Sequence, residues 1–244
     1  MRKLFYAVFA LGLLLSCASP YTISRLTPDE SDIAFWDQGR AFTSQGDEAY
    51  TVKIAFEEST QDHIIMNFEV YNFSDESIMI DPLDFSVQYE MDNGGRPVQR
   101  AVDPESTILD LEMAISRNWA QERNAQTSNA ILAFSEVAAS ATALASGVDA
   151  TPIYESSIDR QINHEGSMQN HANRHYNLHD QRAYYREAVL RKTSIFPGNF
   201  LAGKVVFPRI EASDAMVFRV PVEQRLFEFR FFHFAHRPIA NVAQ

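Results

Sequence analysis

Four histidines in the second half of the chain are the residues best suited to bind a metal ion. His164, His171, His175 and His179 are separated by seven, four and four residues. On one continuous helix this spacing places all four side chains within an arc of about 80°. Because imidazole is a common zinc ligand, the pattern raises the hypothesis of a metal-assisted hydrolase.

Helix geometry restricts such a site. His171 and His179 would lie roughly 12 Å apart along a helix, too far for two ligands that must each be about 2 Å from one ion. One pair spaced by four residues can share an ion only with help from Asp180, His233 or another residue. We therefore keep His171, His175 and His179 as candidate ligands but expect no metal and no cofactor, because a solvated polar face explains the pattern better.

Other catalytic chemistry has little support in the sequence. No serine stands in a G-x-S-x-G setting, and no glycine-rich phosphate loop is present among the nine glycines. The acidic side chains, Asp81 and Asp84 among them, fit a solvated surface, so we assign no catalytic residue. A formal net charge of -11 also argues against a nucleic-acid partner, which would require clustered Lys and Arg.

The first residues have the pattern of an export signal. Arg2 and Lys3 precede an uncharged apolar run from Leu4 to Leu15. Such a run matches the apolar region of a signal peptide, and it is shorter than the ~20 residues that a membrane-spanning helix needs.

The end of this segment, Leu14-Leu15-Ser16-Cys17, resembles the lipobox of bacterial lipoproteins, and Cys17 is the only cysteine of the chain. The resemblance implies a signal peptide over residues 1–16 and a lipid on Cys17 that ties the protein to a membrane. Ala18 and Ser19 follow, which in the sorting pattern of enterobacterial lipoproteins implies the outer membrane of the cell envelope. The alternative is an ordinary secretory cut after Ala18, because Ser16-Cys17-Ala18 has the small-x-small form.

Hydrophobic periodicity predicts one β domain interrupted by helices. Residues 17–48 lack clear periodicity and are interpreted as a lipid-anchored tether. Residues 49–102 and 190–236 alternate apolar and polar side chains, as in the strand Val52, Ile54 and Phe56, and predict a β-sandwich.

Residues 103–189 change to helical spacing and predict a helical hairpin. Asp103-Pro104 is a good helix start, and Gly147 is a good C-terminal cap. We expect the weak patch at 124–129 to bend or split the first helix. The polar second arm is expected to form short helices that are loosely ordered near Gly166.

Two stretches of the β segments resemble immunoglobulin-like modules of bacterial lipoproteins. They are Thr193–Gly198 with Gly203–Pro208, and Asn72–Ser74 with Ile78–Phe85. The resemblance implies an immunoglobulin-like antiparallel β-sandwich, mainly β with an α insertion. Modules of this kind usually bind or brace other molecules, although a fold does not fix a function.

The helical insertion is therefore the expected interaction surface of a non-enzymatic envelope protein, with a protein partner in the cell envelope. A group of small residues supports this view: Ala138, Ala139, Ala141, Ala143 and Ala145. Another helix can approach such a surface closely, and the alternative is simple packing against the second arm. A metal-assisted hydrolase on the histidine-bearing arm remains the second hypothesis.

Overall fold

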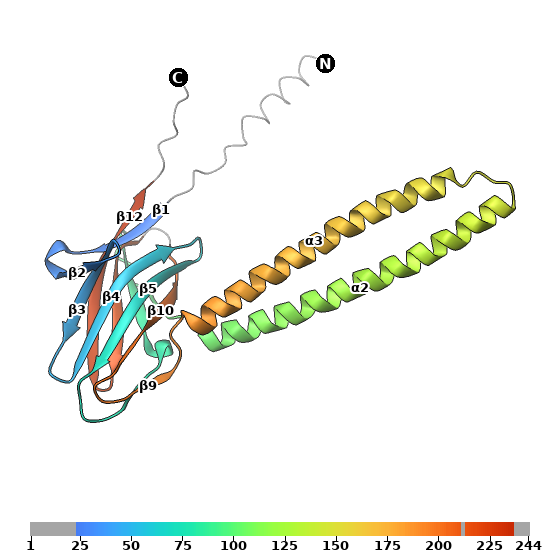
Figure 1. The fold of residues 1–244 in the computed structure, drawn as a ribbon. Helices are drawn as coiled ribbons and strands as arrows, with labels where there is room; N and C mark the ends of the chain where they lie inside the picture. The colour runs from blue at the N-terminus through green and yellow to red at the C-terminus, as the bar shows by residue number, and fades with distance from the viewer. Residues whose placement is uncertain (1–22, 211–212, 237–244) are drawn as a thin grey trace, which may run out of the picture. The chain divides into compact units, whose positions relative to one another are not determined.

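The computed structural model describes residues 23–210 and 213–236, which form two units (Figure 1). One unit is made from the described parts of Met1–Ala101 and Ser194–Gln244 and contains the strands. The other, Val102–Thr193, is helical. The expected signal peptide at 1–16 and the expected lipid site Cys17 lie outside the described residues.

Two five-stranded sheets make up the first unit. The first sheet has the order β1-β12-β11-β7-β8 and the second β10-β5-β4-β3-β2, and all neighbouring strands within them are antiparallel. The strands of the first sheet are β1 (Ile23–Pro28), β7 (Ser86–Met91), β8 (Val98–Arg100), β11 (Ser213–Val222) and β12 (Arg225–His236). Those of the second are β2 (Ile33–Asp37), β3 (Arg40–Gly46), β4 (Tyr50–Ser59), β5 (His63–Asn72) and β10 (Phe200–Pro208).

Short elements complete this unit. β6 (Ile78–Ile80) and β9 (Thr193–Ile195) form a separate two-stranded sheet, and two single turns of 3-10 helix are η1 (Glu30–Asp32) and η2 (Pro82–Asp84). The expectation of an antiparallel, strand-rich fold with a helical insertion is thus confirmed.

The core lies between the two large sheets and is rich in phenylalanine. Phe207 of the second sheet contacts Phe218 of the first, with ring centroids 5.2 Å apart. Phe218 in turn packs edge-on against Phe231, and Phe68 packs against both Phe85 and Phe207. Phe227, Phe229 and Phe231 are all buried, which confirms the expectation that the last strand contributes its phenylalanines to the core. Period-two alternation arises because one face of each strand packs in this layer.

The prediction of a tether over residues 17–48 is wrong for its described part. Residues 23–46 contain β1, β2 and β3, which are hydrogen-bonded members of the two large sheets. β2 has only one partly buried residue among four exposed ones, and its pairing with β3 shifts register between Ile33 and Phe35. An edge strand of this kind leaves little alternation in the sequence.

The helical unit is a hairpin of two long helices, α2 (Pro104–Ala145) and α3 (Thr151–Glu187) (Figure 1). Asp103 caps α2 by accepting a hydrogen bond from the Glu105 amide at 2.9 Å, as its sequence predicts. Gly147 follows the helix with a φ of 68°, and this left-handed backbone confirms the predicted C-terminal cap.

Two details of the helical prediction are wrong. Residues 124–129 do not split α2, which is a single helix of 42 residues. Gly166 lies inside α3, and the second arm is one helix of 37 residues. Good helix formers on both sides of each weak patch, together with packing of the two arms, outweigh the local cost of about 1 kcal/mol for a glycine.

Candidate functional site on the helical hairpin

Ion pairs hold the two helices of the hairpin in register. Glu105 pairs with Arg191 at 2.5 Å, Glu112 with Arg186 at 2.7 Å, and Glu136 with Arg160 at 2.6 Å. As the residue number in α2 rises from 105 to 112 to 136, that of its partner falls from 191 to 186 to 160, so the two arms run antiparallel; Arg191 lies just beyond the end of α3. Each pair on its own is weak in water, but together they fix which turns face each other.

The two halves of α2 differ strongly in burial. Ile108, Leu111, Ile115 and Asn118 are buried in the first half, whereas no residue of the second half is buried. The apolar side chains of the first half follow helical spacing, as expected. Packing within the hairpin therefore leaves the side chains in the second half of α2 largely exposed.

The histidines predicted as candidate ligands lie on the inner side of α3. His171 Nδ1 is 3.2 Å from Asn118 Oδ1, and the Asn118 side-chain amide donates to the His171 carbonyl at 3.1 Å. The His175 ring stacks on Trp119 at a centroid distance of 5.9 Å. His175 and His179 have ring centroids 4.2 Å apart, so these two imidazoles are the adjacent pair.

The environment of His179 favours its neutral form. Desolvation lowers the pKa of His179, and its electrostatic interactions with His175 and Arg182 lower it further, against a smaller effect of Asp180. Its Nε2 is buried without a hydrogen-bond partner in the described structure. Within the described residues, no three His, Cys, Asp or Glu side chains are grouped closely enough to hold a metal ion. His175 and His179 thus form a pair that lacks a third ligand among those residues.

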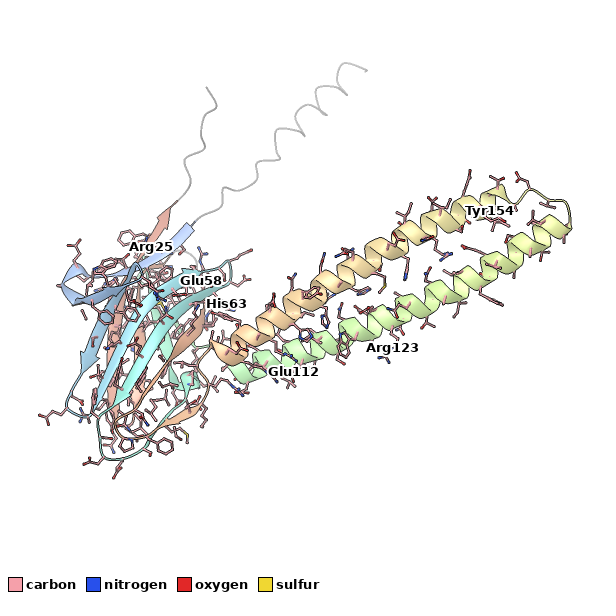
Figure 2. The ribbon with its side chains drawn as sticks, in the orientation of Figure 1. Arg25, Glu58, His63, Glu112, Arg123 and Tyr154 are labelled. Carbon is pink, nitrogen blue, oxygen red and sulfur yellow. The ribbon has the colours of Figure 1, made fainter. Side chains whose placement is uncertain are left out.

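The distal half of the hairpin exposes an unusual amount of apolar surface. Phe134 is 78% exposed, and side chains stand outward along both helices, including Tyr154 near the tip (Figure 2). The exposed large side chains of this region are Ile131, Leu132, Phe134, Val137, Leu144, Val148, Tyr154, Ile158 and Ile162. Within the described residues, α2 is the one helix long and apolar enough to cross a membrane by length and composition.

The side of the distal hairpin that faces inward consists of small or polar residues apart from Ile153. Glu136 and Arg160 form a two-pronged ion pair there, with contacts of 3.0 Å and 2.6 Å, and Arg160 also bonds Asn129. The hydrogen bonds from Arg160 lower the pKa of Glu136, so the carboxylate stays charged. This half of the hairpin therefore places charge inside and large apolar side chains outside, the reverse of the usual arrangement in water.

The five alanines noted in the sequence were expected either to pack against the second arm or to offer a surface to another molecule. Ala143 is half-buried on the side toward α3, while Ala138, Ala139, Ala141 and Ala145 are exposed. Packing against the second arm thus accounts for one of these five alanines. The other four remain open to a further molecule.

A cleft in the β unit was missed by sequence reasoning. It has a volume of about 420 Å³ and lies between β1, the β2–β3 hairpin and β4. Its lining includes Arg25, the 60% exposed Trp36, and Glu57. The tether interpretation had assigned β1, β2 and β3 to a region without a fold, so the only available signal was the bulk of Phe35 and Trp36.

Glu57 is the centre of a charged network beside this cleft. It accepts hydrogen bonds from Arg40 at 2.8 Å and Asn67 at 2.5 Å, and pairs with Lys204 at 2.8 Å. Burial alone would raise the pKa of Glu57, but the bonds from Lys204, Arg40 and Asn67 lower it from 4.5 to about 2. The network joins β3, β4, β5 and β10 across one sheet, which is a structural role.

No family model, no curated protein and no solved structure matches the chain.

Proposed function

We propose that this protein is a lipid-anchored component of the bacterial cell envelope that acts as a non-enzymatic binding module, with the distal half of its helical hairpin as the interaction surface. The observation that carries the proposal is the outward display of large apolar side chains there, among them Phe134, Val137 and Tyr154. Contiguous apolar patches beyond a few hundred Å² are rare on isolated soluble proteins and mark sites of association.

The anchor is supported by the sequence alone. A lipid on Cys17 would tie the β unit to a membrane, and the residues after Cys17 favour the outer membrane. The immunoglobulin-like likeness of the β segments is part of the same proposal, since such modules usually bind or brace.

The second hypothesis, a metal-assisted hydrolase, has weaker support. It would need a third ligand beside His175 and His179, and the described part of the chain groups none with them. His171 is also engaged with Asn118 through Nδ1. We therefore favour the binding module.

A shortened hairpin tests the proposal directly. Removing residues 127–140 and 156–169 takes two heptads from each arm, or about 21 Å, while leaving the connecting loop and His171, His175 and His179 in place. Crosslinking in native membranes followed by capture of the full-length protein should recover a partner, and the shortened variant should lose it.

Two further measurements complete this test. Retention of the partner by the shortened variant would exclude the distal hairpin as the binding surface. Bound zinc together with hydrolytic turnover that His175→Ala abolishes would favour the enzyme instead. Mass spectrometry of the mature N-terminus should find lipid on Cys17, and an unmodified peptide there would remove the anchor.

A further inference from the structure

The exposed apolar side chains of the distal hairpin form one stripe along each helix. Each stripe is displaced by a constant number of residues from the seam, which is the line of half-buried residues along which the two helices face each other. On the distal part of α2 the half-buried residues that face α3 are Asn129, Ala133, Glu136, Ser140 and Ala143. The residue directly after each of them is exposed and small or apolar: Ala130, Phe134, Val137, Ala141 and Leu144. This stripe alternates intervals of four and three residues.

The second helix repeats this relation. Ile153 and Ser157 of α3 are half-buried, and the residues that follow them, Tyr154 and Ile158, are exposed. Ile162 is 62% exposed as well, but it lies two residues after the half-buried Arg160 and therefore off the stripe, on the side of α3 away from α2. One residue along a helix is a rotation of about 100°, so both stripes are turned from the seam in the same sense.

This relation places both stripes on one face of the hairpin. Two antiparallel helices are related by a two-fold axis perpendicular to the plane that contains them. Equal rotations from the seam therefore point to the same side of that plane. The opposite face is mostly small or polar: Ser128, Leu132, Ser135, Ala139, Thr142, Pro152, Ser156, Asp159 and Asn163. The distal hairpin thus has one apolar face and one largely polar face.

We infer that the occupant of this face is a second copy of the same chain, whose hairpin packs on it to form a four-helix bundle. The inference rests on the proposed function of the hairpin as an interaction surface and names its partner. Intervals of four and three residues are those of helices that pack knobs into holes. The alternation of Ala130 and Ala141 with Phe134 and Leu144 supplies both knobs and holes, so the face can pack on its own copy.

The area available reaches the lower limit for a specific dimer. Five large side chains on the face are each more than half exposed: Phe134, Val137, Leu144, Tyr154 and Ile158. At on the order of 100 Å² each they offer about 500 Å² per copy, or about 1,000 Å² in a dimer, which is the lower limit for a specific interface.

Charge around the face favours a protein over a lipid bilayer. Residues 127–168 contain five acidic side chains and one basic side chain, and that one, Arg160, is paired with Glu136. Immersion in a bilayer would also desolvate the polar face with Asp159 and Asn163, whereas a second copy covers the apolar face alone. An acidic tip is moreover repelled by anionic headgroups, which attract Lys and Arg.

Two copies of the full-length protein that carry different tags test the inference. Expressed together and extracted in a mild detergent, they should copurify as a dimer by native mass spectrometry. Phe134→Glu and Ile158→Glu, one on each stripe, should each reduce copurification about tenfold or more. The matched controls Ser135→Glu and Ser156→Glu add the same charge to exposed positions of the same helices off the stripes and should leave it unchanged.

The alternative outcomes separate this inference from the proposed function. A monomeric protein that captures a different envelope protein through Phe134 overturns the second copy but retains the binding module. Binding of the distal hairpin to vesicles of phosphatidylethanolamine and phosphatidylglycerol, lost in Phe134→Glu, overturns it in favour of lipid. Equal dimerisation of all four variants places the dimer contact elsewhere and overturns it as well.

Discussion

Asn118 on α2 and His171 on α3 contact each other twice across the hairpin. The Asn118 amide donates to the His171 carbonyl at 3.1 Å, and the carbonyl oxygen of its side chain lies 3.2 Å from His171 Nδ1. The second contact is a hydrogen bond only when Nδ1 carries the proton. A buried polar residue with fully matched partners fixes the register of two helices, because any axial shift leaves it unpaired.

We expect Asn118→Ala to destabilise the hairpin by about 1–3 kcal/mol, since it leaves the His171 Nδ1 proton without its acceptor. Asn118 is only 1% exposed, so water does not replace the lost contact easily. Native-state hydrogen exchange of the α2 amides measures the change. The exposed Asn124→Ala on the same helix should stay within about 0.5 kcal/mol of the wild type.

A double-mutant cycle with His171→Ala separates the pair from other effects. The two substitutions together should cost less than the sum of their separate costs by about 1 kcal/mol. Strict additivity would show that the two residues do not support each other.

The two glycines of the helical unit should respond in opposite directions to alanine. Gly147 has a φ of 68°, which L-residues adopt at a cost, so Gly147→Ala should lower hairpin stability by about 1 kcal/mol. Gly166 lies inside α3 with no atom near the position of an added Cβ, so Gly166→Ala should raise stability by up to about 1 kcal/mol. Thermal unfolding followed by far-UV circular dichroism compares the two. Changes of the same sign would contradict the assigned backbone of one glycine.

The same positions show what the sequence could and could not reveal. Gly147 was predicted as a cap because apolar spacing ended just before it, whereas Gly166 was expected to loosen a helix that is in fact continuous. The second error arose because α3 lacks a strong apolar stripe, so its helicity is supported by residues of the other arm that the sequence does not place. The strand around Val52 and Ile54 was found because these two side chains are fully buried while Lys53 between them is half-exposed.

The site itself was only partly predictable. The alanine-rich surface was visible in the sequence, but which side of α2 meets α3 depends on Glu136 and Arg160, which are 24 residues apart. From the sequence alone, without knowledge of that pairing, an apolar stripe beside a polar one is interpreted as the side of the helix that packs in the core. The cleft near Trp36 was missed because β2 is short and mostly exposed, and because the buried residues of β3, Phe42 and Thr43, are adjacent and do not alternate.

Stability of the hairpin should fall as the pH drops through the range in which His179 becomes protonated. Its pKa is lowered from 6.5 in the fold, so the unfolded chain binds a proton more readily than the folded one. The stability of the neutral form is therefore fully present above pH 6.5 and is lost progressively below it. Hydrogen exchange around residues 175–183, corrected for intrinsic rates, should show opening that grows as the pH is lowered from about 7.5 to 5.

His179→Gln should remove most of this pH dependence. His164→Gln, on the same helix but away from His175 and Arg182, serves as the control and should keep the wild-type slope. A slope that persists in His179→Gln would assign the effect to another group.

Glu57 should make the β unit sensitive to acid in a lower range. Its pKa is about 2 in the fold against 4.5 ordinarily, so its ion pairs with Arg40 and Lys204 contribute fully above pH 4.5 and are lost as the pH falls toward 2. The carboxylate is partly solvated, which limits the contribution to at most about 2 kcal/mol. Glu57→Gln should lower stability by about that amount at pH 7 and much less near pH 2, measured by urea unfolding. Glu58→Gln, the exposed neighbour, should change stability little at either pH. An equal loss in Glu57→Gln at pH 7 and pH 2 would mean that packing of the side chain, and not its charge, joins the four strands.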